Sequence, residues 1–81
     1  MRLLYLHHTG DSGRGGHTCV ATIDVELNPD VRLYKLRVLR MKDGRYRVNA
    51  PYAGRYLAAS FSPALAQRLT EMAVEALQVA A

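Results

Sequence analysis

The chain has 81 residues, of which 11 are Lys or Arg and 7 are Asp or Glu, with 49% hydrophobic content and one cysteine. A chain of this length has room for one domain, so we expect a single unit over residues 1–81 and exclude a large multidomain enzyme. A domain this short buries a small core, and association with a second copy is a natural way to enlarge it.

The lone Cys19 excludes an internal disulfide and a cysteine-rich metal module. The N-terminal apolar run is interrupted at His7 and His8, too early for a signal-peptide core. No later apolar run approaches the roughly 18 residues of a membrane span. We therefore expect a cytoplasmic protein with no membrane partner.

The positive charge is concentrated in the middle of the chain. Residues 31–55 hold eight cations against Asp43 alone, a local charge of +7, whereas residues 1–30 and 62–81 are each mildly acidic. Nine of the eleven cations are arginine, whose planar fork binds phosphate through two hydrogen bonds and stacks on bases. Four of the five tyrosines lie in or beside the same segment, namely Tyr34, Tyr46, Tyr52 and Tyr56.

This distribution has two interpretations. Basic strands with interleaved aromatic residues are typical of platforms that bind single-stranded nucleic acid. Alternatively, the arginines form the solvated faces of edge strands, where charge prevents aggregation and the tyrosines are half buried beside them. Ordinary surfaces mix charges of both signs, so the one-sided charge favours a face that binds a polyanion.

The first part of the chain predicts two strands joined by a loop. Residues 2–7 are apolar and too few for a helix, and residues 9–16 hold four glycines, which predicts a flexible loop. Apolar and polar residues alternate over residues 18–27, which predicts a half-buried strand. Residues 28–30, Asn-Pro-Asp, predict a turn, because Asn bonds the backbone ahead and Pro fixes φ.

A second hairpin is predicted in the basic segment. Residues 31–41 predict a strand whose two-residue period breaks near Lys35, as a bulge or burial on both faces would explain. The pair Asp43-Gly44 favours a tight hairpin, and residues 45–50 alternate again as the returning strand.

The C-terminal part predicts a last strand over residues 55–61 and then a helix over residues 62–80. Ser62 is a preferred N-cap, and Pro63 suits the first helical position because its missing N–H would be unpaired there. The helix is amphipathic. Its apolar stripe consists of Leu65, Leu69, Met72, Ala73, Ala76, Leu77 and Ala80.

The order of these elements predicts the fold class. Strands followed by a single helix, with no βαβ alternation, indicate an α+β fold. We expect a small antiparallel sheet of four to five strands, with one amphipathic C-terminal helix packed on it. No internal repeat and no second domain is visible.

Residues suited to catalysis or metal binding are sparse. The seven acids include no close pair in a core context. His7, His8 and His17 flank the glycine-rich loop, but a metal site needs three or four converging ligands. The alternation places Cys19 on an apolar face, where a thiol is inert. We therefore expect no enzyme activity, no cofactor, no metal and no small-molecule substrate.

The order of motifs over residues 18–78 resembles the SpoVG family, the stage V sporulation protein G or septation-regulator group of small bacterial proteins. The matching features are the strand ATIDVEL, the run LYKLRVL, the hairpin MKDGRYRVNAP, the strand RYLAASF and the helix that begins with Ser62 and Pro63. The resemblance implies a short antiparallel sheet with a C-terminal helix, a homodimer, and binding to DNA or RNA in gene regulation.

The chain departs from that family in its cations. The family's longer basic insert before the last strand is reduced here to residues 52–55, and the helix carries Arg68 as its only cation. The arginines of the sheet must therefore make most contacts with phosphate, with tyrosines available for base stacking. The predicted nucleic-acid-binding residues are Arg37, Arg40, Lys42, Arg45, Arg47, Arg55, Tyr46, Tyr52 and Arg68, the last from the resemblance alone.

A second hypothesis involves no nucleic acid. In it the chain is a protein interaction module that dimerises by pairing an exposed strand edge, and the arginines keep that edge soluble. The positions of the cations in space discriminate the two hypotheses. One continuous positive face favours nucleic-acid binding, and a scattered ring favours the interaction module.

Overall fold

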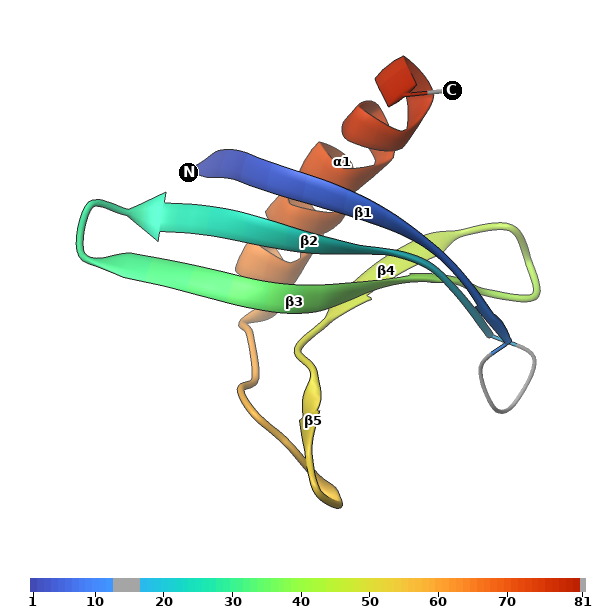
Figure 1. Cartoon of the computed structure of the whole chain (residues 1–81), viewed down its shortest axis with the longest axis horizontal. Coiled ribbons are helices and arrows are strands. Elements are labelled where there is room, and N and C mark those ends of the chain that lie inside the picture. Colours follow the sequence, from blue (N-terminus) through green and yellow to red (C-terminus); the bar gives the residue numbers. More distant parts are fainter. Residues whose placement is uncertain (13–16, 81) are drawn as a thin grey trace.

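The computed structural model describes residues 1–12 and 17–80, and it has the predicted α+β fold. Four strands form one antiparallel sheet in sequence order, and a separate two-stranded hairpin and one helix follow. Figure 1 shows the helix lying across one face of the sheet and the small hairpin projecting away from the sheet. The elements are β1 (Arg2–Ser12), β2 (Thr18–Asn28), β3 (Val31–Arg40), β4 (Tyr46–Asn49), β5 (Tyr52–Ala53), β6 (Tyr56–Leu57) and α1 (Pro63–Ala80).

Strand β2 separates a buried face of the sheet from an uncovered one. Along β2, buried side chains alternate with partly exposed ones from Thr18 to Glu26, which confirms the predicted half-buried strand. Three of these buried side chains, Ala21, Ile23 and Val25, meet α1 and the neighbouring strands in one cluster, and Cys19 is buried outside it, opposite Leu39. That cluster comprises Ala21, Ile23, Val25, Leu36, Val38, Val48, Ala50, Leu69 and Ala73.

The predicted irregularity near Lys35 is a bulge. The register passes from Ile23 opposite Leu36 to Val25 opposite Leu33, so β3 holds one residue more than β2. Lys35 has a φ of 58°, and its N–H donates to Asp24 Oδ1 at 2.8 Å. The bulge lets Leu33 and Leu36, three residues apart, both pack on the core face.

Both predicted turns are present. The side-chain oxygen of Asn28 accepts a hydrogen bond from the N–H of Asp30 at 2.8 Å, which closes the β2–β3 turn. Between β3 and β4, the Met41 carbonyl accepts from Gly44 N–H at 3.0 Å, and Met41 N–H donates to the Arg45 carbonyl at 2.8 Å. Gly44 has a φ of 87°, as a three-residue hairpin loop with a left-handed last residue requires.

Two predicted boundaries are wrong. The first strand does not end at residue 7 but continues to Ser12, because β1 keeps pairing with β2 as far as Thr18. Residues 9–12 of the predicted loop are therefore strand, and residues 13–16 lie outside the described residues.

The predicted strand over residues 55–61 is also wrong, since only Tyr56–Leu57 is extended and paired. Gly54, with a φ of 67°, and Arg55 form a tight turn that returns the chain to β5. The N–H of Ala58 then donates to the Pro51 carbonyl at 2.8 Å. The Ala-Ala-Ser sequence that follows has a weak strand preference, so the ladder ends there.

Helix α1 begins as predicted and covers the edge strand β4. Ser62 Oγ accepts a hydrogen bond from Leu65 N–H at 3.2 Å, which makes Ser62 the N-cap. Two turns later, Thr70 Oγ1 donates to the Ala66 carbonyl at 2.8 Å and accepts from Val48 N–H at 3.2 Å. The helix thereby satisfies a backbone N–H of β4 that has no strand partner on that side.

Replacing Thr70 tests this junction. Thr70→Val keeps the shape of the side chain but leaves the partly buried Val48 N–H without an acceptor. We expect the free energy of unfolding in urea to fall by about 1–3 kcal/mol. Thr70→Ser keeps the hydroxyl and is the control. Equal stability of the Val and Ser variants would show that the hydrogen bond contributes nothing.

Replacing Lys35 tests the bulge. A residue with a side chain costs about 1–2 kcal/mol in the left-handed region, and glycine adopts that region freely at a smaller entropic cost. We expect Lys35→Gly to raise the free energy of unfolding by about 0.5 kcal/mol. Lys35→Ala removes the same side chain but keeps Cβ, so it should give no gain. A loss of stability in the Gly variant alone would contradict the strained backbone.

Candidate nucleic-acid interface

One row of polar side chains crosses all four strands of the sheet. His7 on β1 lies opposite Thr22, Thr22 lies opposite Arg37 on β3, and Arg37 lies opposite Asn49 on β4. Residues paired in this way point to the same side of a sheet. On each strand a neighbour of the row residue belongs to the core or packs against it. The row therefore lies on the face turned away from α1, which we call the open face.

Aromatic rings lie toward both ends of this row. On β1, the Tyr5 and His7 rings are stacked, with centroids 6.2 Å apart and planes inclined by 21°. At the other end, the guanidinium carbon of Arg37 lies 5.6 Å from the centroid of the Tyr52 ring. Tyr5 is 57% exposed and Tyr52 is 60% exposed. Two flat aromatic surfaces are thus available to solvent on the open face.

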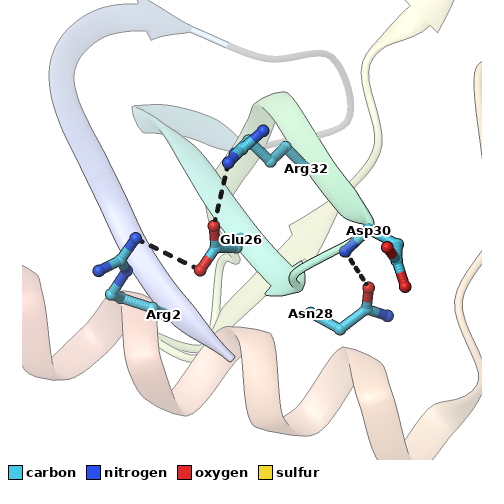
Figure 2. Close-up of polar contacts among 5 residues, drawn as sticks. All are labelled: Arg2, Glu26, Asn28, Asp30 and Arg32. Atoms are coloured by element: carbon cyan, nitrogen blue, oxygen red, sulfur yellow. Dashed lines mark hydrogen bonds and ion pairs between the residues drawn. The ribbon is translucent and has the colours of Figure 1, made fainter.

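Acidic side chains occupy the end of the open face nearest the β2–β3 turn. Glu26 Oε2 lies 3.3 Å from Arg2 Nη2, and Glu26 Oε1 lies 3.4 Å from Arg32 Nη2, so one carboxylate joins β1, β2 and β3 (Figure 2). Both arginine side chains are mostly exposed, and such pairs stabilise a fold by little. Their effect is local, because one carboxylate offsets part of the charge of two cations at this end.

The predicted residues of the basic strands β3 and β4 divide between the two faces of the sheet. Arg37 and Tyr52 lie together on the open face. Arg47 precedes the β4 member of the row by two residues and so points to the same face. Arg40 and Tyr46 are paired with each other, and Tyr46 packs against the core on the side of α1. Of the two tyrosines predicted to stack on bases, only Tyr52 is on the open face.

The remaining predicted residues lie at loops and on the helix. Lys42 and Arg45 are exposed in the β3–β4 loop, where Arg45 Nε lies 3.6 Å from Asp43 Oδ2. Arg55 is exposed in the β5–β6 turn, and Arg68 is exposed on α1. The structure therefore brings most of the predicted cations onto the β3–β4 hairpin and leaves Arg68 away from the open face.

Sequence reasoning missed Tyr5, His7, Thr22 and Asn49 as members of this surface. The alternation of Tyr5, Leu6 and His7 could have indicated that Tyr5 and His7 share a face of β1. A second bulge, earlier in the same strand, obscures that alternation. Leu3 lies opposite Val25 and Tyr5 lies opposite Asp24, so Leu4 is the extra residue. Leu3 and Leu6 both pack on the core although three residues separate them, and a two-residue period cannot describe that spacing.

The two neighbouring histidines of β1 do not converge on one site. His7 and His8 are neighbours on β1 and point to opposite faces, and the described residues include no group of three or more His, Cys, Asp or Glu side chains that could hold a metal ion. Within the same residues, no helix is both long enough and apolar enough to cross a membrane.

Comparison of the chain with protein-family models, curated proteins and solved structures found no match.

A separate apolar groove lies between the edge strand β1 and the C-terminal half of α1. It is open to solvent and has a volume of about 470 Å³. Arg2 and Glu75, of opposite charge, also line it. Its apolar lining consists of Met1, Leu3, Leu6, Met72 and Ala76.

Proposed function

We propose that this chain is a small regulatory protein that binds DNA or RNA through its open face and the adjoining β3–β4 hairpin. The observation that carries the proposal is the position of Arg37 beside the exposed Tyr52 ring, with Arg47 on the same face of the sheet. Arginine binds phosphate through its fork, and tyrosine stacks on bases. A face that combines the two side chains suits a ligand with a charged backbone and flat bases.

The charges of the β3–β4 hairpin support the same proposal. The hairpin carries five of the predicted cations, and among the described residues only Arg45 of these five forms an ion pair, with Asp43. The charge of the other four therefore remains available for phosphate, whereas Arg2 and Arg32 share an ion pair with Glu26. The five are Arg37, Arg40, Lys42, Arg45 and Arg47.

The resemblance of the motif order to the SpoVG family is a second support, and it suggests gene regulation as the role. In this proposal the sheet arginines take over the contacts that helix cations make in that family, since α1 carries only Arg68. We place the function in the cytoplasm, where the single free Cys19 stays reduced.

Salt dependence of binding tests this proposal. Six phosphate contacts, by the hairpin cations and Arg55, predict a slope of log affinity against log salt of roughly −4 to −5, at about −0.7 per contact for single strands. Replacing Arg45 and Arg47 by Ala should weaken binding to all sequences alike and reduce the slope by about 1.4. Fluorescence anisotropy with labelled DNA and RNA oligomers measures both quantities.

Arg68→Ala is the matched control, because it removes one exposed arginine from α1 and should leave the slope unchanged. Absence of binding by the wild-type chain to every oligomer at about 50 mM salt would end the proposal. If Arg68→Ala reduced the slope of log affinity against log salt as much as the loss of one hairpin arginine does, the interface would lie on the helix instead.

The β1 edge favours a second candidate function, assembly into a homodimer. β1 is an edge of the sheet, and its regular stretch from Tyr5 to His8 lies between two irregular positions of the register. An unpaired strand edge beside an apolar groove can pair antiparallel with the same edge of a second copy.

Sedimentation equilibrium tests the dimer. The wild-type chain should have twice the mass of one chain, and Leu4→Lys, which places a charge at the exposed β1 edge, should be monomeric. Leu57→Lys adds the same charge at an exposed position on β6 and should stay dimeric. A wild-type chain that is monomeric at every concentration, or a Leu4 variant that stays dimeric, would contradict pairing through β1.

A further inference from the structure

We infer that the open face is a stacking site for unpaired bases, so that the ligand is single-stranded nucleic acid and not a duplex. The inference rests on the proposed nucleic-acid binding and names its substrate class. It comes from the geometry of the aromatic rings and from the placement of charge around them.

The first stacking surface is the ring pair on β1. Tyr5 and His7 are two residues apart and therefore on the same face, and their planes are only 21° from parallel. Both residues are exposed. A nucleobase is a flat aromatic ring, and stacking on such a surface is favourable for all four bases. The ring pair thus provides a flat surface that is not specific to one base.

The second stacking surface is Tyr52, and Arg37 holds its ring in place. The guanidinium group lies over the ring at 5.6 Å from its centroid, a cation–π contact, while 60% of the residue stays exposed. Arg37 belongs to the open-face row, so Tyr52 is fixed at the end of the row opposite to Tyr5. Three strand spacings separate β1 from β4, about 14 Å. RNA-recognition motifs, which also present one face of a four-stranded sheet, stack two or three bases on it.

Hydrogen-bonding groups lie between the two stacking surfaces. Thr22 and Asn49 belong to the row and are partly exposed. A hydroxyl and a side-chain amide both donate and accept hydrogen bonds, so each can bond the edge of a base. Base edges are free in a single strand, whereas in a duplex they are paired and the ring faces are covered by neighbouring bases.

Charge determines on which side of the row the phosphates lie. Asp24 and Glu26 occupy the side nearest the β2–β3 turn, where a phosphate would be repelled. Arg47 occupies the other side of the open face, and Lys42 and Arg45 lie beyond it in the β3–β4 loop. The backbone of a bound strand therefore passes along the β3–β4 hairpin while its bases lie over the row. Stacking and phosphate contacts then come from different residues, and they can be removed separately.

Tyrosine replacements test the inference without changing the charge. We expect Tyr5→Leu and Tyr52→Leu each to weaken binding of a labelled single strand by about 5-fold to about 100-fold, with the salt slope unchanged. Tyr5→Phe and Tyr52→Phe keep the ring and should bind like the wild type. Tyr56→Leu is the matched control, since Tyr56 is 74% exposed on the same small hairpin and its pairing with Ala53 places it on the face opposite Tyr52.

The duplex formed by annealing the complementary strand is the second ligand. The inference predicts at least about 10-fold weaker binding of the duplex at equal salt, and no effect of the tyrosine variants on it. Equal or tighter duplex binding, or normal single-strand binding by both Leu variants, would overturn the stacking site while salt-dependent binding keeps the proposed function. Absence of binding to either ligand would instead end the proposed function. Circular dichroism of each variant confirms that it is folded.

Discussion

The packing of α1 against one face of the sheet is the contact on which the rest of the structure depends. Leu69 and Ala73 of the helix are fully buried in the same cluster as the buried residues of β2, β3 and β4. A chain with a single helix covers only one face of a four-stranded sheet. Because side chains alternate along a strand, a shift of one residue would exchange the two faces. The core therefore fixes which polar side chains reach the open face.

Two bulges, at Leu4 and at Lys35, allow the sequence to keep its leucines on the core face although their spacing does not follow this alternation. Each inserts one residue between apolar side chains that must both reach the core. Without the extra residue, a hydrophobic side chain would point to the open face and a polar one to the core. Asp24 satisfies the exposed N–H at the Lys35 bulge. The open face is thus a consequence of core packing combined with local backbone irregularity.

Much of the fold could be predicted because its signals are local. The alternation in β2, the Asp-Gly hairpin and the Ser62 cap each depend on residues close in sequence, and each is present. The extent of β1 could not be predicted, since it depends on pairing with β2 across the glycine-rich segment. For the site, the charge pattern indicated Arg37 and Arg47. That these two lie on the face opposite Arg40 and Tyr46 depends on the strand register, which the sequence alone does not give. Tyr5 lies on the same face as Arg37 only because of the order of the strands in the sheet.

The central claim is that nucleic acid binds to the face of the sheet opposite α1. Amide chemical-shift mapping by NMR during titration with a single-stranded oligonucleotide tests it most directly, because every strand and the helix report at once. We predict that the largest shifts fall on His7, Thr22, Arg37, Asn49 and Tyr52, with small shifts on the exposed side of α1. Largest shifts at Gln67, Arg68 and Glu71 on the helix would contradict the account.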